Sequence, residues 1–448
     1  MAGDCWKAVT IDQIKAETDR AIAIGPFGSR MKSDLYTNDG VPVIRGNNIT
    51  DTRVLGGDFV YVADETADEL SSSNVLPGDL VFPHRGAIGL VGIVPFNVAK
   101  RYIMSTSMMK LTCNTSIVDP LYIYYFFRST VGRHELLKHA STVGTPGIGQ
   151  PLTSLRSISL RLPERSEQRA IAHILGTLDD KIELNRRTNE TLEAMARALF
   201  KSWFADFDPV RAKARGQDVR LPRTLASLFP GSFENSESGA IPAGWFVQSL
   251  SQLSNIYSGG TPSKSVADYW GGELPWISPK AMTAIHVDRS DEKVTPMAIG
   301  NGTRLVSNGS VLVMVRGMGL HQGVRISQAR RDVTFNQDVK AFVPKWGDGT
   351  FLLFALLDAS AYLFSKVQAS GHGTGVLPTD ILEGMSFPVP PPGVREKLTK
   401  PLSDFNAKIA ANSRMSEILA SLRDTLLPKL ISGELRVKDA ERIVERVA

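Results

Sequence analysis

The chain has few of the residues that build disulfide frameworks or metal centres. Its two cysteines, Cys5 and Cys113, cannot supply a disulfide framework or a thiolate zinc site, and so low a number is typical of a reducing compartment. We expect both to be unreactive packing thiols. The seven histidines stand singly, without the spacing of zinc ligands. The sequence therefore predicts no metal site.

Long apolar runs are missing as well. The first ten residues, MAGDCWKAVT, lack the apolar core of a secretory signal. Residues 121–127 are too few to cross a bilayer, and residues 351–364 are interrupted by Asp358. We therefore expect a soluble, cytoplasmic protein.

The chain also lacks a strong excess of one charge. A net charge of +5 over 448 residues is compatible with nucleic-acid binding but does not single it out. Hydrophobic residues make up 42% and charged residues 22%, which is ordinary for a folded protein and excludes wholesale disorder. The length predicts about three structural units.

Catalytic motifs are absent in the same way. There is no Walker phosphate loop, no nucleophile-elbow serine, and no glycine-rich cofactor loop with the polar-Pro-Pro-aromatic tetrapeptide of a base methyltransferase. Asp338-Val339-Lys340 imitates one element of a metal-dependent nuclease, but its counterpart in residues 108–110, Met-Met-Lys, lacks the acid. We expect a non-catalytic chain and keep a free-standing nuclease as an alternative.

What the chain does contain is a second copy of itself. Pro378 follows Pro151 by 227 residues, and the same offset relates Asn412 to Asn185. The opening tryptophans, Trp6 and Trp245, differ by 239, so the first copy is 12 residues longer. Two copies in one chain predict a pseudo-two-fold molecule, which suits a two-sided partner such as duplex DNA.

Each copy has the same order of elements. A glycine turn (25–29 and 259–263) is followed by short apolar segments that predict strands, and one of these runs into an Arg-Gly pair, Arg85-Gly86 or Arg316-Gly317. Aromatic-rich helical segments and a glycine loop (144–149 and 371–375) come next. The Arg-Gly pairs share an offset of 231, which indicates one fold built twice.

A long helix with a heptad pattern ends each copy. The seam residues are Leu175, Leu178, Ile182, Asn185, Leu192 and Leu199 in the first helix and Leu402, Phe405, Ile409, Asn412, Leu419 and Leu426 in the second. We expect the helices to pair as an antiparallel coiled coil, with Asn185 and Asn412 near the centre. The alternative is that each helix packs only on its own globular domain.

These patterns predict an α+β fold of two pseudo-symmetric domains, each of mixed strands and helices and each followed by a long helix. We place the first domain at 1–163, the first long helix at 164–204 and a linker, partly ordered at best, at 205–240. The second domain follows at 241–390, the second long helix at 391–433 and a C-terminal tail at 434–448.

Polar and basic residues on the turns of both copies are candidates for DNA binding. Arginine can read guanine, asparagine or glutamine can read adenine, and lysine mostly holds phosphate. The candidates in the first copy are Arg30, Lys32, Arg45, Asn47, Asn48, Arg85, Lys100, Arg101 and Lys110; those in the second are Lys264, Lys280, Arg316, His321, Gln322, Arg325 and Lys340. The alternative is that they are solvated loop charges or braces of turns.

Several segments resemble the specificity subunits of type I restriction-modification systems. They are LPERSEQRAIAHIL (162–175), LDDKIELN (178–185), ALFKSWF (198–204), IPAGW (241–245), YWGGELPWIS (269–278) and LPKLISGEL (427–435). The resemblance covers nearly the whole chain. One departure is that residues 392–397 lack the Glu-Gln pair that residues 165–170 contain.

The resemblance implies two target-recognition domains, each reading half of a bipartite, asymmetric site on double-stranded DNA. It also implies that the helices space the domains and dock two methyltransferase subunits, with two translocase/nuclease subunits as further candidate partners. S-adenosylmethionine would then belong to the methyltransferase, ATP and Mg to the nuclease, and no cofactor to this chain. The alternative from another class is a coiled-coil scaffold that binds only protein.

Overall fold

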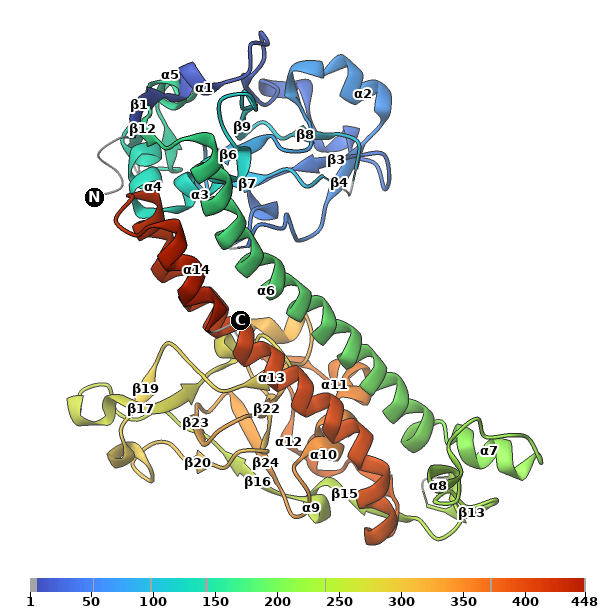
Figure 1. Ribbon diagram of the computed structural model, residues 1–448. Helices are drawn as coiled ribbons and strands as arrows, with labels where there is room; N and C mark the ends of the chain where they lie inside the picture. Colours follow the sequence, from blue (N-terminus) through green and yellow to red (C-terminus); the bar gives the residue numbers. More distant parts are fainter. Residues whose placement is uncertain are drawn as a thin grey trace. The chain divides into compact units, whose positions relative to one another are not determined.

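The computed structural model describes residues 6–50, 52–96, 99–141, 144–237, 239–370 and 373–446 (Figure 1). The chain forms two compact units: Met1–Arg186 with Arg414–Ala448, and Arg187–Ser413. The boundary between them crosses both long helices, so each unit contains a segment of each helix. No described helix is both long and apolar enough to cross a membrane. Cys5 lies outside the described residues, whereas Cys113 is buried and burial raises the pKa of its thiol.

The first unit is built on two four-stranded sheets and a closing pair of strands. One sheet has the order β2-β9-β6-β7, from Ile22–Ile24, Met108–Leu111, Leu80–Pro83 and Gly92–Ile93. The other has the order β4-β3-β8-β5, from Val60–Val62, Val41–Ile44, Tyr102–Met104 and Asn74–Val75. β1 (Lys7–Thr10) pairs antiparallel with β12 (Ser159–Leu162), which joins the beginning of the domain to its end.

Apart from its segments of the long helices, the remaining elements of this unit are short, and one of them is the aromatic helix α3 (Pro120–Arg128). The Asp119 side chain caps α3 by accepting hydrogen bonds from backbone amides of the first turn. The aromatic side chains of α3 fill the core of the unit. The others are α1 (Ile11–Ile14), α2 (Asp64–Glu69), α4 (Thr130–Leu137), β10 (Ala140–Ser141), β11 (Gly147–Ile148), α5 (Pro151–Ser157) and α14 (Val437–Glu445).

The second unit repeats this plan. A five-stranded sheet has the order β16-β24-β21-β22-β18, from Ser254–Ser258, Val339–Pro344, Val311–Met314, Ile326–Ala329 and His286–Val287. A four-stranded sheet has the order β19-β17-β23-β20, from Lys293–Val294, Trp270–Ile277, Val333–Phe335 and Leu305–Val306. β15 (Phe246–Ser249) pairs with β27 (Ser386–Val389) as β1 pairs with β12.

In the second unit, α10 (Thr350–Asp358) is the equivalent of α3, and it is buried along nearly all of its length. The unit also contains helices α9 (Leu250–Leu253), α11 (Ser360–Ser365) and α12 (Thr379–Glu383) and the paired strands β25 (Gln368–Ala369) and β26 (Gly375–Val376).

Strand register confirms the duplication residue by residue. Leu80 lies opposite Leu111, and Val311 opposite Phe342, so both partners shift by 231. By this register Lys340 corresponds to Met109 and Lys110 to Ala341. The sequence comparison of residues 108–110 with 338–340 was therefore wrong by one residue, because neither segment has a glycine or proline to fix it.

The two long helices, α6 (Arg165–Phe200) and α13 (Pro392–Ile431), pair antiparallel in each unit. In the first unit Asn185 donates to the Ser416 hydroxyl over 3.1 Å. In the second, Asn412 donates to Asn189 over 2.9 Å, and Asn189 donates to Ser413 over 3.1 Å. The predicted coiled-coil pairing is confirmed.

Seam residues of both helices are packed within their own unit. Leu175, Leu178, Leu419 and Leu426 are buried in the core of the first unit, with Ile182 packed against it. Leu402 and Ile409 are buried in the core of the second, with Leu192, Leu199 and Phe405 packed against it. The helices therefore pack on each other and on a globular domain at once, so the alternative that each helix packs on its own domain alone is wrong.

A buried polar residue ties each long helix to its domain at equivalent positions, Asp179 and Asn406, which are 227 residues apart. Asp179 accepts hydrogen bonds from Tyr125 and Arg423, each over 2.6 Å. Asn406 donates to Gln328 over 2.6 Å and hydrogen-bonds His286. Each tie satisfies polar groups that would otherwise be buried without partners.

The departure from the Glu-Gln pair has a local structural replacement. Gln168 is buried, accepts from the Asp119 amide over 2.9 Å and donates to the Pro163 carbonyl over 2.9 Å. At the equivalent position of the second copy, the Arg395 guanidinium lies 3.5 Å from the centre of the Trp346 ring. A cation–π contact thus takes the place of the glutamine's hydrogen bonds.

The expected linker is folded, in contrast to the prediction. After the π-helical turn Lys201–Ala205, the chain forms α7 (Asp208–Ala214), α8 (Arg223–Ala226) and the hairpin β13–β14 (Phe233–Ser236 and Gly239–Pro242). Phe207 and Phe229 are buried against Trp203 and Trp245. Scattered aromatic residues supply a core here that the proline- and serine-rich composition hides.

The Asp179–Arg423 pair provides a test of the tie in the first unit. The two side chains are 5% and 10% exposed, so Arg423→Met would leave a buried carboxylate without its cation. We expect the first unit to lose about 3 to 5 kcal/mol of stability, measured by urea denaturation of the full chain. Arg414→Met, an exposed change on the same helix, should cost less than about 0.5 kcal/mol. Equal effects would contradict the tie.

His286 makes the second unit sensitive to acid. Burial lowers the pKa of His286 from 6.5 to about 4, so the unfolded chain binds its proton more readily than the folded one. This contribution to stability is complete above pH 6.5 and is lost as the pH falls towards 4, by on the order of 3 kcal/mol. Tryptophan fluorescence will follow it, since five of the six tryptophans lie in this unit. His286→Gln should flatten the dependence, and an unaltered profile would count against it.

Candidate nucleic-acid interface

Five loops of the first unit meet at one end of its sheets. His84, just after β6, donates its backbone amide to Ser107 and accepts from Ile148, both over 2.9 Å. Gly86 donates to Pro146 over 2.8 Å, and Gly25 donates to Met108 over 2.8 Å. We call residues 25–32, 45–48, 84–87, 105–107 and 144–149 the first loop cluster.

The loop at 45–48 belongs to this cluster because of strand direction. β3 and β8 run parallel, so their carboxyl ends lie at the same edge of the sheet. The Ser105 amide, just after β8, donates to the carbonyl of Ile44 over 2.9 Å. Arg45 therefore begins beside Ser105.

The second unit contains the same arrangement, formed by residues 259–264, 278–281, 315–322, 336–338 and 373–377, the second loop cluster. Val315 donates to Asp338 over 2.8 Å and accepts from Leu377 over 2.8 Å. Gly317 donates to Gly375 over 3.0 Å, and Asn336 donates to Ile277 over 2.9 Å. Both clusters are held together by backbone hydrogen bonds, which leave side chains free for other contacts.

Glycine is required where these loops approach each other. Gly86 and Gly317 have φ angles of +80° and +133°, which side chains rarely adopt. A Cβ on Gly25 would lie 1.9 Å from the carbonyl oxygen of Ser105, and one on Gly259 would lie 2.2 Å from that of Asn336. The repeated glycines thus fix the loop frame.

The two arginines before these glycines are the best-placed candidates. Arg85 and Arg316 are exposed, and among the described residues neither guanidinium has a hydrogen-bond or ion-pair partner. The same holds for the side chains of Arg30, Lys32 and Asn47 in the first cluster and Gln322 in the second. His321 hydrogen-bonds the Gly373 carbonyl over 2.9 Å.

Several other candidates from the first copy serve the fold instead. Asn48 is fully buried and donates to the Gly56 carbonyl over 2.9 Å, and Arg45 donates to the Asp58 carbonyl over 2.6 Å. Lys110 is buried 3.5 Å from the carboxylate of Asp79. A lysine held in this way is a poor phosphate ligand, because binding would break its buried ion pair.

Lys100 and Arg101 precede β8 and so lie at the opposite end of that strand from the cluster. Arg101 pairs with Asp64 over 2.6 Å and with Asp68 over 2.5 Å, and these hydrogen bonds raise the pKa of its guanidinium. Lys100 is exposed.

Candidates in the second copy divide in the same way. Lys264 and Lys280 lie in the cluster and make exposed ion pairs with Glu292 over 3.2 Å and with Asp291 over 3.1 Å. Such pairs exchange readily, because exposed ion pairs contribute little. Arg325 donates to the Pro279 carbonyl over 2.7 Å and Lys340 to the Ser258 hydroxyl over 2.9 Å.

The clusters also contain apolar side chains, which the pattern of basic and polar residues in the sequence does not predict. Phe27 is 74% exposed and Met318 is 66% exposed, whereas Met31 is buried and anchors its loop. The sequence signal was present, as a phenylalanine between glycines in Gly25-Pro26-Phe27-Gly28, but exposure could not be read from it.

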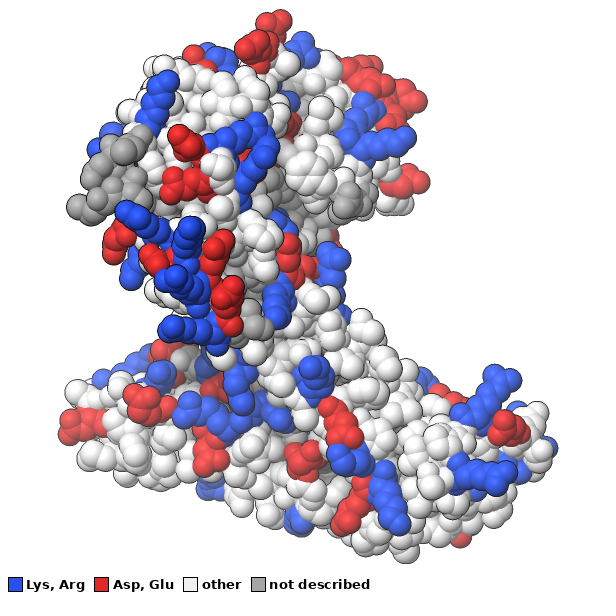
Figure 2. All heavy atoms as spheres, viewed as in Figure 1, with Lys and Arg blue, Asp and Glu red and all other residues white. Residues whose placement is uncertain are grey.

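The face of the molecule shown in Figure 2 has no large surface patch of one charge. On the face shown in Figure 2, lysine and arginine side chains are interspersed with aspartate and glutamate, including over α14. The arginines of the loop clusters are distinguished by their position and by exposed guanidinium groups that have no partners among the described residues.

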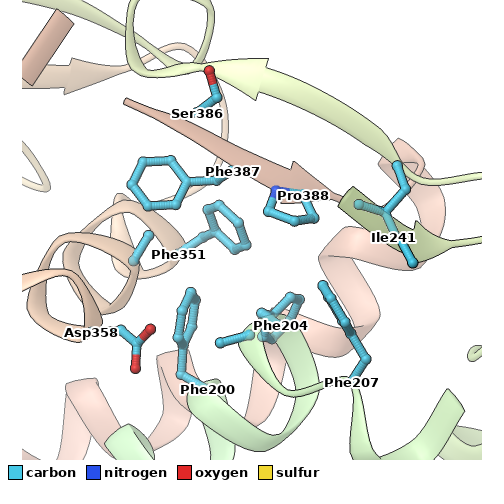
Figure 3. Close-up of a pocket in the computed structure, with 12 residues that line it drawn as sticks. Phe200, Phe204, Phe207, Ile241, Phe351, Asp358, Ser386, Phe387 and Pro388 are labelled. Atoms are coloured by element: carbon cyan, nitrogen blue, oxygen red, sulfur yellow. The ribbon is translucent and has the colours of Figure 1, made fainter. Parts of the chain in front are cut away.

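The second unit also has a cavity of about 290 Å³, shown in Figure 3. Its walls are aromatic, from Phe200, Phe204, Phe351 and Phe387, with the Asp358 carboxylate beside them. Burial raises the pKa of Asp358. No histidine or second carboxylate lines the cavity, and the described residues include no cluster of metal-binding side chains. This cavity therefore has no catalytic constellation.

Comparison with known proteins agrees with the duplicated architecture. The family model described as the type I restriction modification DNA specificity domain matches twice, at residues 25–194 and 242–419. The type I restriction enzyme HindI specificity subunit of Haemophilus influenzae is 28% identical over 386 residues, covering 76% of this chain and 82% of the relative. The MjaIX specificity subunit of Methanocaldococcus jannaschii is 24% identical over 402 residues, 87% of each chain.

A solved structure shares the fold. The type I restriction-modification S subunit from M. genitalium superposes with a TM-score of 0.58 at 15% identity, covering 95% of this chain and 96% of that one. Each loop cluster lies within one of the two segments that the family model matches. The chain therefore belongs to the family of type I restriction-modification DNA specificity domains and carries that domain twice.

Proposed function

We propose that this type I specificity subunit reads a bipartite, asymmetric site on double-stranded DNA, with one half-site contacted by each loop cluster. The observation that carries the proposal is the duplicated, backbone-braced frame that presents Arg85 in one domain and Arg316 in the other. Both guanidinium groups are exposed and, among the described residues, without partners.

The chemistry of the clusters suits base reading in the major groove. A guanidinium can donate two hydrogen bonds to O6 and N7 of guanine, and this is the commonest base-specific contact. The glycine beside each arginine lets the backbone approach a phosphate without a side chain in the way. Arg30, Lys32, Lys264 and Lys280 would hold the phosphates, whereas Asn47 and Gln322 are candidates for reading adenine.

The long helices would set the distance between the half-sites and dock two methyltransferase subunits. Two readers on one face of B-DNA sit about one turn, or roughly 10 base pairs, apart. The polar ties at Asp179 and Asn406 support this role, since they fix α6 to the first domain and α13 to the second. A change in helix length would then change the gap between half-sites.

Catalysis would belong to the partners. Methyltransferase subunits would bring S-adenosylmethionine and act on a flipped adenine, and translocase/nuclease subunits, where the complex has them, would use ATP and Mg. This chain would supply the DNA address in the cytoplasm without a cofactor of its own.

A methylation map tests the proposal. Long-read sequencing would compare DNA from cells that express this chain with its cognate methyltransferase and from cells that lack only this chain. We expect one split motif, with adenine methylated in both halves and a fixed gap between them, in the first cells alone. Identical maps, with assembly of the proteins shown by co-purification, would refute sequence-specific delivery of methylation.

A further inference from the structure

Phe27 is a large apolar side chain displayed on the first loop cluster. It is 74% exposed, the largest exposed fraction among the large hydrophobic side chains that the structure describes. A single exposed apolar residue is common at protein surfaces and needs no function by itself. What sets Phe27 apart is that its loop is anchored on both sides and that basic residues follow it in the sequence.

The loop is fixed on both sides of Phe27. On one side, Gly25 donates to Met108 over 2.8 Å and lies so close to Ser105 that no side chain would fit. On the other, Met31 is 7% exposed and packs with Val41 and Val43 in the core. An exposed apolar ring on a loop anchored at both sides is pre-positioned for a partner.

The charge around Phe27 favours a polyanion. Arg30 and Lys32 are exposed, and within the part of the chain that the structure describes their side chains have no hydrogen-bond or ion-pair partner. Residues 25–32 contain no aspartate or glutamate. A ring next to free cations is suited to a nucleic acid, in which stacked bases lie between phosphates.

The second domain has a different residue at this position. Ile24 lies opposite Met109, and Ser258 lies opposite the equivalent Lys340, so Phe27 corresponds to Thr261. The Thr261 hydroxyl donates to the amide oxygen of Gln337 over 2.6 Å and so braces a neighbouring loop of its own cluster. The aromatic ring is a feature of the first domain's loop alone.

We propose that Phe27 is a wedge that inserts into the DNA duplex and unstacks one base step in the half-site read by the first domain. This inference rests on the proposed function. Apolar wedges of this kind kink duplexes in other DNA-binding proteins, and the sequence of the wedged step then adds specificity through the ease of its deformation.

The test uses the complete complex of this chain with its methyltransferase subunits. Duplexes carrying the mapped target would contain 2-aminopurine at one position at a time, since its fluorescence rises when it is unstacked. We expect the wild-type complex to raise fluorescence at one step other than the methylated adenine. Phe27→Ala should abolish that rise, leave the opposite half-site unchanged and weaken binding by about fivefold to a hundredfold. Phe27→Trp should retain both effects.

Phe96→Ala is the matched control. Phe96 is 67% exposed and lies in the same unit. It lies beside Gly78, which precedes β6, whereas residues 84–87 of the first loop cluster follow β6, so Phe96 lies at the other end of that strand. It should alter neither fluorescence nor affinity. With 2-aminopurine at the position of the flipped adenine, the rise in fluorescence should persist in Phe27→Ala. Its persistence will show that the complex is intact.

Three results would separate the possibilities. Unchanged fluorescence and affinity in Phe27→Ala would overturn the wedge while leaving the proposed function standing. Weakened assembly of Phe27→Ala with the methyltransferase in the absence of DNA would identify a protein contact and also overturn it. A wild-type complex with no preference for the mapped target would instead refute the proposed function.

Discussion

The fold depends most on the buried polar residue that each long helix presents to its own domain. In the first unit one carboxylate, Asp179, binds both Tyr125 of the domain and Arg423 of the paired helix. In the second, the amide of Asn406 binds strands β18 and β22 through His286 and Gln328. Apolar packing is non-directional and by itself sets the register of a helix on a domain less strictly than a hydrogen bond does. A buried polar group fixes one register, because any other leaves it without partners.

A similar division of work applies in the loop clusters. Backbone amides, carbonyls and glycines hold the loops together, as in the contacts of Gly86 with Pro146 and of Gly317 with Gly375. The side chains of Arg85 and Arg316 contribute nothing to that frame. The side chains at these two positions could therefore be exchanged without loss of the loop frame.

Much of the architecture could be predicted from sequence because the two copies within the chain can be aligned with each other. The offsets of 239, 231 and 227 reappear as strand pairings, and the heptads reappear as a helix pair. The fate of individual candidates could not be predicted. In the sequence, Lys110 and Asn48 look like free polar residues. In the fold both are buried, Lys110 beside Asp79 and Asn48 against the Gly56 carbonyl. The folding of the expected linker was hidden for a similar reason, since Phe207 and Phe229 pack against Trp245 and Trp203.

The most direct test of two independent readers is a methylation map of the single variants Arg85→Ala and Arg316→Ala, with Lys100→Ala as a control for the loss of one exposed charge. If each loop cluster reads its own half-site, each arginine variant will relax or weaken only one half of the motif, a different half in each case. The other half, and the gap between them, will be unchanged, and Lys100→Ala will preserve the whole motif. Loss of both halves in each variant, or an unaltered motif in both, would contradict the account.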